Sequence, residues 1–200
     1  MSSKDQRRIQ GPEKTSPFSI FQQSKPLKFA NKDNMRHDGR SPVDVQKLFM
    51  TLDIISQAKG SSFIEAGDTK VVCGVYGPRE VQRGTDFKLT GQVSCEVKFA
   101  PFSSKVRKSP QPDRSQKEIS RQLKEALETV IIVEKFPKAQ IDVHITVIEC
   151  GGSLLSTCLT AAGLALCHAS IDVYDLVIGA DVIWREGMSY VNPSQHELDC

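Results

Sequence analysis

Alternating apolar and polar side chains mark several stretches of the chain and predict β-strands. In residues 61–77, two apolar runs flank Gly67-Asp68, a dipeptide that favours a tight turn, so we expect a β-hairpin. Residues 92–102 predict a further strand with one solvated side, and residues 139–150 predict a long strand. The alternating apolar residues are Val93, Cys95, Val97 and Phe99 in the first of these, and Ile141, Val143, Ile145 and Val147 in the second.

Two other stretches have helical periodicity. Ser115-x-x-Glu118 has the pattern of a capping box, and the apolar residues after it keep helical spacing until Pro137. Residues 154–170 contain no charged side chain apart from His168, so we expect a helix that is buried nearly all round. Helices packed on a mostly antiparallel or mixed sheet form an α+β architecture. The apolar positions of the first helix are Ile119, Leu123, Leu127, Val130 and Ile131.

Composition divides the chain into two parts. Residues 1–35 are rich in Ser, Lys, Gln and Pro and predict a polar N-terminal arm, whereas residues 36–200 carry the periodic patterns of one domain. The net charge of +2 is too small to indicate a nucleic-acid partner, so such a role would need local clusters of basic residues. No stretch has the pattern of a signal peptide or a membrane span, and we expect no membrane partner and an intracellular protein.

The six cysteines contain no C-x-x-C pair, and three of them lie within apolar runs, which predicts free, buried thiols in a reducing compartment. A metal site would need distant cysteines to converge, so we expect none. His144 fits a half-buried structural residue better than a catalytic base, since no Ser or Cys partner lies near it in the sequence. The three cysteines are Cys73, Cys158 and Cys167.

The stretch "ECGGSLLST", residues 149–157, is the strongest candidate for a ligand site. A strand runs into Gly151-Gly152-Ser153 and a helix follows, so free backbone N–H groups and the helix dipole could hold an anion there. No Arg or Lys follows the glycines, however, and the pair also fits the ordinary geometry of a helix start. Both interpretations stay open at this point.

Five quoted stretches, in order and spacing, carry a resemblance to a known family. They are "RHDGRSP", "SSFIEAGDTKVVCGVYGPRE", "FAPFSSKVRKSPQPDRSQKEISRQLKEALE", "FPKAQIDVHITVIEC" and "AAGLAL" followed by "IDVYDLVIG". Together they resemble the ribonuclease PH family, and within it the ring subunits of the RNA exosome, over residues 36–200. The resemblance implies a ribosomal-protein-S5 domain 2-like core, with six such domains forming a hexameric ring around an RNA channel.

The same resemblance implies a catalytically inactive member. Active relatives hold phosphate with an arginine in a "GTRT" motif, and Leu155 falls at that position. Of a second arginine pair, Arg114 is present and Ser115 follows it. Asn192 and Leu198 fall where active relatives carry two carboxylates, with Asp199 one residue out of register. We therefore expect no catalytic residues, no cofactor and no metal.

The resemblance also implies contacts with RNA, since the equivalent segments of ring subunits face the channel or its neck. The expected partners are other RNase PH-type subunits, an S1/KH-type cap subunit and RNA, in the nucleus, the nucleolus and the cytoplasm. Alternatives are an active phosphorolytic 3′–5′ exoribonuclease, a free-standing RNA-binding protein, and a basic loop that is merely solvated. The candidate RNA-binding residues are Arg79, Arg83, Lys105, Arg107, Lys108 and Arg114.

Domains of this family continue through a further strand pair and a closing helix, whereas this sequence stops at Cys200. We therefore expect residues 36–200 to lack those elements and to leave an apolar sheet face uncovered.

Overall fold

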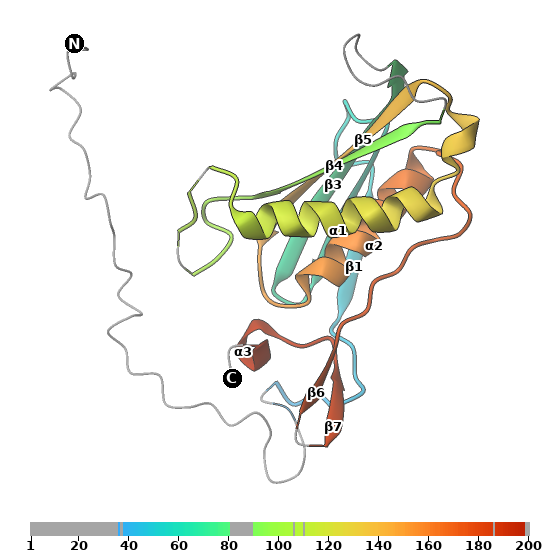
Figure 1. Cartoon of the computed structure of the whole chain (residues 1–200). Coiled ribbons are helices and arrows are strands. Elements are labelled where there is room, and N and C mark those ends of the chain that lie inside the picture. The colour runs from blue at the N-terminus through green and yellow to red at the C-terminus, as the bar shows by residue number, and fades with distance from the viewer. Residues whose placement is uncertain are drawn as a thin grey trace, which may run out of the picture.

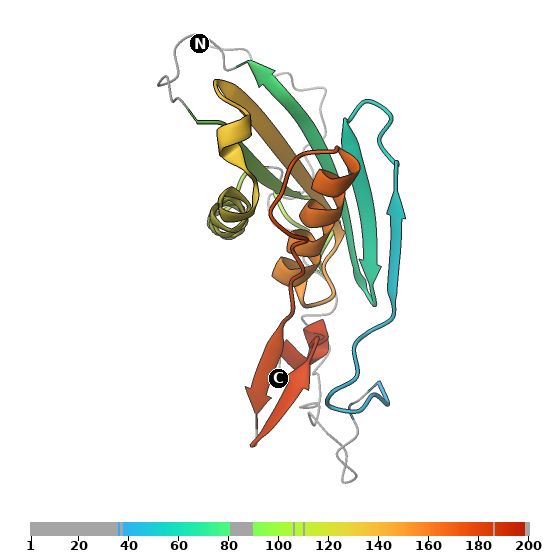
Figure 2. The same cartoon turned by 90° about the vertical axis from the view of Figure 1, so that its right-hand side faces the viewer.

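The computed structural model describes residue 36 and residues 38–80, 90–105, 107–109, 111–185 and 187–198. The expected arm, residues 1–35, lies outside the described residues. Five strands form one sheet in the order β1-β2-β3-β5-β4, and two helices pack side by side on one of its faces (Figures 1 and 2). The strands are β1 (Leu48–Leu52), β2 (Gly60–Ala66), β3 (Thr69–Glu80), β4 (Gln92–Phe99) and β5 (Ala139–Glu149). This confirms the predicted α+β fold.

The antiparallel part of the sheet follows from two hairpin-like connections. β2 and β3 pair antiparallel around the predicted turn, in which Gly67 has a φ of 56° that glycine adopts without strain. β1 pairs antiparallel with β2, and β3 pairs antiparallel with β5. The alternating residues of β3 and β5 face the helices and are buried, which confirms the two-residue period of these strands.

The parallel part of the sheet is a crossover unit. β4 pairs parallel with β5, and helix α1 (Arg114–Val130) connects them, with the 3₁₀ turn η2 (Val133–Lys135) leading into β5. Leu123 and Leu127 of α1 are fully buried against the sheet. The helix begins two residues earlier than the pattern predicted: Asp113 is the N-cap and Gln116 closes the capping box, so the cap predicted at Ser115 is wrong. The Asp113 carboxylate accepts the N–H of Arg114, the first helical residue, at 2.6 Å. Ser115 already lies inside the helix and therefore cannot be its cap.

Helix α2 (Leu154–His168) is apolar and mostly buried, as its sequence predicts. Its alanines and Cys158 contact the sheet beside β2 and β3, and Gly60 of β2 allows the close approach, since a Cβ there would lie 2.4 Å from the carbonyl oxygen of Ala165. Cys167 is an exception to the predicted burial: it lies exposed near the end of the helix. Among the described cysteines none forms a disulfide.

The last described segment forms a small unit beside one end of the sheet (Figure 1). β6 (Val182–Arg185) and β7 (Met188–Val191) form a hairpin, and the short helix α3 (Gln195–Leu198) follows. Arg36, fully buried, joins this segment to the start of the domain: it donates to both carboxylate oxygens of Glu197, at 2.8 and 3.0 Å, and to the carbonyl of Val191 at 2.7 Å. A buried charge is stable only with such partners.

Exposed apolar side chains gather along β1 and the segment before β6. These side chains lie at one edge of the sheet and not on the uncovered sheet face that the sequence analysis expected, because α1 and α2 cover the apolar face over β3 and β5. Within the described part of the chain, no helix has the length and apolar character needed to cross a membrane. The exposed residues of this surface are Val43, Val45, Leu48, Met50, Leu52, Leu176, Ile178 and Val182.

Candidate functional site

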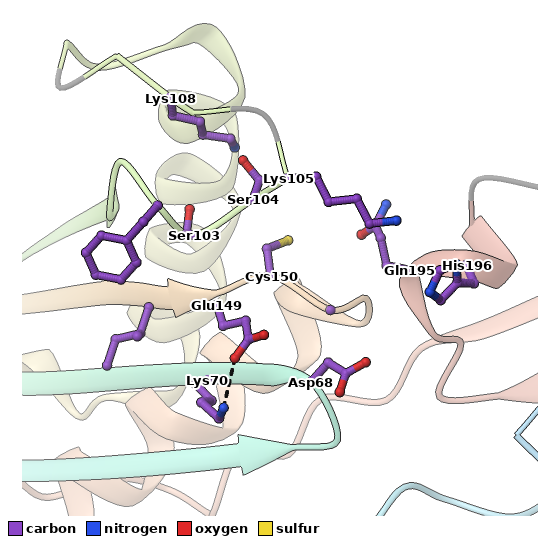
Figure 3. A pocket seen from close by; sticks show the side chains of 13 residues that line it. Asp68, Lys70, Ser103, Ser104, Lys105, Lys108, Glu149, Cys150, Gln195 and His196 are labelled. Carbon is purple, nitrogen blue, oxygen red and sulfur yellow. Dashed lines mark hydrogen bonds and ion pairs between the residues drawn. The ribbon is translucent and has the colours of Figure 1, made fainter. Parts of the chain in front are cut away.

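A pocket of about 890 Å³ lies at the end of the sheet where β3 begins and β5 ends (Figure 3). The loop after β4 forms one wall through residues 103–105 and 108, and the start of α3 forms the opposite wall. Gly151, from the predicted ligand stretch, lies between these walls. The other lining residues are Asp68, Lys70, Phe102, Ser103, Ser104, Lys105, Lys108, Ile148, Glu149, Cys150, Gln195 and His196.

The pocket carries both signs of charge. Lys70 donates to Glu149 at 2.8 Å across the β3–β5 pair, and this hydrogen bond raises the pKa of the Lys70 ammonium. Lys105 extends toward α3 in Figure 3, and the Nζ atom of Lys108 lies 3.6 Å from the ring centroid of Phe99. Asp68 adds a second carboxylate on the floor. Carboxylates beside the lysines weaken the attraction of this pocket for an anion.

The glycines at the start of α2 are required by the packing of the chain itself. A Cβ on Gly152, whose φ is 108°, would lie 2.5 Å from the carbonyl oxygen of Pro193, and a Cβ on Gly151 would lie 2.4 Å from the Cβ of Asp68. Ser153 adopts a left-handed conformation, and its hydroxyl donates to the Pro193 carbonyl at 3.1 Å. The segment before α3 therefore packs directly against the helix start, which favours the geometric interpretation of the glycine pair over an anion site.

Buried polar groups stabilise the same junction. Thr69 donates to the carbonyl of Gly152 at 2.6 Å and accepts from the N–H of Gly151 at 3.2 Å. The N–H of Gln195 donates to the carbonyl of Gly151 at 2.7 Å. The hydroxyl of Ser103 is buried and has no hydrogen-bond partner among the described residues. Among the described residues that line the pocket, it is the one buried polar side-chain atom without such a partner.

The positions that the resemblance assigns to the catalytic groups of active relatives do not line this pocket. Leu155 lies on the first turn of α2 with 36% of its surface exposed, and Leu198 is also exposed on α3. Asn192, with a φ of 52°, instead lines a second, smaller groove beside β1. Asp199 lies outside the described residues. The described residues thus assemble neither a cation clamp nor a carboxylate pair at the helix start.

The candidate RNA-binding residues separate into two groups. Lys105, Arg107 and Lys108 share the loop after β4, and Arg114 begins α1 nearby in the chain. Arg79 lies near the far end of β3, about 30 Å from Lys70 by the rise of a strand. Arg79 and the loop therefore lie toward opposite ends of the sheet. Arg83 lies outside the described residues.

Arg79 also has a local partner. Its guanidinium forms an ion pair with Asp142, a carboxylate on β5 that is almost fully buried. Gln140 donates to the same carboxylate at 2.6 Å. Arg79 remains largely exposed, so it could contact a phosphate, but part of its charge is already balanced.

His144 is half exposed on the open face of the sheet, in agreement with its predicted structural place. Its Nδ1 lies 3.4 Å from Glu96, and its ring makes an edge contact with Tyr76. Over the described ranges, no three His, Cys, Asp or Glu side chains converge in a way that could hold a metal ion.

Sequence reasoning missed Asp68 and Lys70 as pocket residues, whereas Glu149 begins the predicted ligand stretch. Gly67-Asp68 was assigned to a turn and Glu149 to a strand end, but nothing in the sequence shows that the two segments are neighbours. The β3–β5 pairing brings Lys70 opposite Glu149. The turn and the strand end could each be recognised in the sequence, but the strand pairing that brings them together could not.

Comparison with known proteins identifies the fold. Residues 44–172 match the model of RNase PH, described as the 3′ exoribonuclease family, domain 1. The chain belongs to this family. The RNase PH assignment agrees with the resemblance carried by the motifs and with the β4–α1–β5 unit.

Curated relatives of the RNase PH family cover most of the chain. The Exosome complex component MTR3 of Mus musculus is 35% identical over 198 residues, which cover 92% of this chain and 70% of that protein. The MTR3 of Homo sapiens is also 35% identical and covers 92% of this chain and 69% of its own length. The Exosome complex component Rrp41 of Pyrobaculum islandicum is 41% identical over 171 residues, which cover 84% of this chain and 65% of that protein.

Solved structures share the architecture. The crystal structure of rice (Oryza sativa) Rrp46 matches with a TM-score of 0.72 at 25% identity, covering 82% of this chain and 76% of that one. A chain of the Archaeoglobus fulgidus exosome with RNA bound to the active site matches with a TM-score of 0.73 at 25% identity. The match covers 84% of this chain and 74% of that one.

Proposed function

We propose that this chain is a non-catalytic subunit of an RNA exosome ring, where it would stabilise the ring and contact RNA during 3′–5′ processing and degradation. Family membership supports the RNase PH-type domain, and the names of the MTR3 and Rrp41 relatives support the exosome. The neighbours in the ring would be other RNase PH-type subunits, with an S1/KH-type cap subunit, in the nucleus, nucleolus and cytoplasm.

The observation that carries the non-catalytic assignment is the start of α2. Phosphorolysis brings inorganic phosphate to about 3–3.5 Å from a phosphodiester, so a cation must offset the repulsion of two anions. Leu155 supplies no cation at this helix start, and the backbone of residues 193–195 packs against its glycines. The nearby lysines share their pocket with Asp68 and Glu149. Loss of a single electrostatic group of this kind typically costs about 10²–10³ in rate.

An active phosphorolytic exoribonuclease is the second candidate, and the identity with archaeal Rrp41 chains favours it. The test is release of nucleoside diphosphate from oligo(A) with phosphate and Mg²⁺, in a ring whose other subunits carry inactivating substitutions. We expect no turnover, and no gain from Leu155→Arg alone. Only the triple variant with Asn192→Asp and Leu198→Asp would restore a trace of activity. Turnover by the unmodified chain at the rate of an active relative would contradict the proposal.

RNA contact would centre on the loop after β4. Lys105, Arg107 and Lys108 would contact phosphates without reading sequence, which suits a channel that passes any RNA. Replacing all three by Ala should weaken RNA capture by the assembled ring and lower the salt slope by about one unit for each lost contact. Lys117→Ala/Lys124→Ala, on the exposed side of α1, is the matched control. An unchanged slope in the loop variant would mean that the loop is only solvated.

Arg79 needs a separate measurement, because Arg79→Ala would leave the buried carboxylate of Asp142 without its ion-pair partner. The double variant Arg79→Ala/Asp142→Asn removes both charges and should test the RNA contact with less loss of stability. The hypothesis of a free-standing RNA-binding protein predicts that the chain does not bind RNase PH-type subunits when it is co-expressed with them. Co-purification in a complex of defined mass would exclude that hypothesis.

A further inference from the structure

The outer edge of β1 is open for pairing. The N–H of Asp53 donates to Ser61 at 3.2 Å, and Lys47 accepts from Gly67 at 3.3 Å, so the odd-numbered residues of this strand face β2. In an antiparallel ladder the residues between them direct their N–H and C=O groups to the other side. No described strand lies beyond β1. The groups directed outward belong to Leu48, Met50 and Leu52.

Apolar side chains surround this edge on both faces of the strand. Phe49 lies on the open face of the sheet beside Phe63, and 59% of its surface is exposed. Met50, on the helix side, is 50% exposed and lines a groove of about 230 Å³ between β1, α2 and residues 178–181. An exposed, apolar edge strand is a template for pairing with another chain.

The sequence around β1 is complementary to itself in the antiparallel direction. In the segment "KLFMTLD", a basic residue precedes the strand and an acidic residue follows its end, and the residues between are apolar apart from Thr51. An antiparallel copy centred on Met50 places Lys47 opposite Asp53 at both ends. Both residues are exposed. The same register opposes Leu48 to Leu52, so the outward-facing backbone groups meet each other.

We propose that β1 pairs with β1 of a second copy of this chain, antiparallel and centred on Met50, to form a continuous ten-stranded sheet. Each opposed outward-facing pair exchanges two backbone hydrogen bonds. Lys47 of each copy attracts Asp53 of the other, and cross-strand charge pairs of this kind favour one register. The two-fold axis runs perpendicular to the sheet, so α1 and α2 of both copies lie on the same face and Leu48, Met50 and Leu52 of the copies lie side by side.

The occupant is a second copy because its own β1 has a basic residue before the strand and an acidic residue after it, which the antiparallel register requires at both ends. The pairing is also short. Stable interfaces bury at least about 1,200 Å² in total, and a five-residue strand pair reaches only part of that area. We therefore infer a reversible dimer of the free chain, which does not depend on the exosome assignment.

Charge exchange tests this register. Sedimentation velocity of the full chain over a concentration series should show a monomer–dimer equilibrium. Lys47→Glu should raise the dissociation constant of the dimer about tenfold or more, because at each end of the paired strands two carboxylates then lie opposite each other. Asp53→Lys should do the same. The left-handed backbone at Asp53 accepts lysine, since Lys138 has the same conformation in this chain. A thermal melt confirms that each variant is folded.

Recovery of the dimer by compensating charge changes distinguishes this register from non-specific association. The double variant Lys47→Glu/Asp53→Lys should dimerise as the parent chain does, and an equimolar mixture of the two single variants should form heterodimers more tightly than either dimerises alone. Lys98→Glu on the opposite edge of the sheet is the matched control and should change nothing. A monomer at every concentration, or association that these charge changes leave unaltered, would overturn the proposal.

Discussion

The two edges of the sheet, β1 and β4, are built in opposite ways. β1 is apolar and exposed along its length, and its outer backbone groups face solvent. At β4, helix α1 lies over the edge: the hydroxyl of Ser120 accepts from the N–H of Val97 at 3.0 Å, a backbone group that points away from β5. Charged Glu96 and Lys98 occupy the open face of the same strand. Both devices discourage pairing with another chain.

The difference follows from connectivity. β4 joins its parallel neighbour β5, and a parallel connection needs a crossover helix, which falls across the edge of the sheet. β1 joins its antiparallel neighbour β2 through residues 53–59, so no helix is placed beside it. One edge is thus covered by its own connection, whereas the other remains available to a partner.

The largest difference between the two edges should appear in the unfolding free energy that is lost when one aromatic ring is removed from each edge. Phe99 of β4 is 7% exposed, and Phe99→Ala should cost about 3–5 kcal/mol of unfolding free energy through the cavity that it leaves. Phe49→Ala on β1 should cost less than about 1 kcal/mol, since that ring is mostly in solvent already. Urea unfolding of both variants measures the two values. Equal losses would contradict the contrast between a covered and an open edge.

Most of the sheet and both long helices could be predicted from periodicity alone. The alternation in residues 139–149 and the apolar helix from Leu154 are strong local signals, and the structure confirms both. β1 was not predicted, because its residues are apolar on both faces and therefore show no alternation. The place of the β6–β7 hairpin beside the start of the domain depends on the buried contact of Arg36 with Glu197, which joins segments far apart in the sequence.

The candidate site was predicted in part. The Gly-Gly-Ser stretch was recognisable as a helix start, yet what packs against Gly152 comes from Pro193, some forty residues later in the chain. The basic loop was visible as a run of lysine and arginine, but its separation from Arg79 is a consequence of strand direction. Local signals predict elements, and pairing decides which of their residues become neighbours.

The helix that covers β4 offers a smaller test. Asp113 caps α1 and accepts the N–H of Arg114 at 2.6 Å, so Asp113→Ala should lower the unfolding free energy by about 1 kcal/mol. Ser115→Ala is the matched control: its exposed hydroxyl only donates to Asp113 at 3.2 Å, and the loss should be a few tenths of a kcal/mol at most. Thermal or urea unfolding of the pair measures the difference. A larger loss for Ser115→Ala would place the cap where the sequence pattern suggested.

The smallest perturbation compares the edges through one thiol on each. Burial raises the pKa of Cys95 on β4 to about 12, so at pH 8 very little of it is thiolate, the form that reacts. A cysteine introduced by Met50→Cys on exposed β1 should keep an ordinary pKa near 8.5 and react with iodoacetamide at least about tenfold faster. Mass spectrometry of the alkylated peptides, in dilute protein, gives both rates in one sample. Raising the pH toward 10 should accelerate Cys95 without levelling off, since its titration lies far above, whereas the β1 thiol should approach a plateau. Comparable rates at pH 8 would mean that α1 leaves the β4 edge as open as β1.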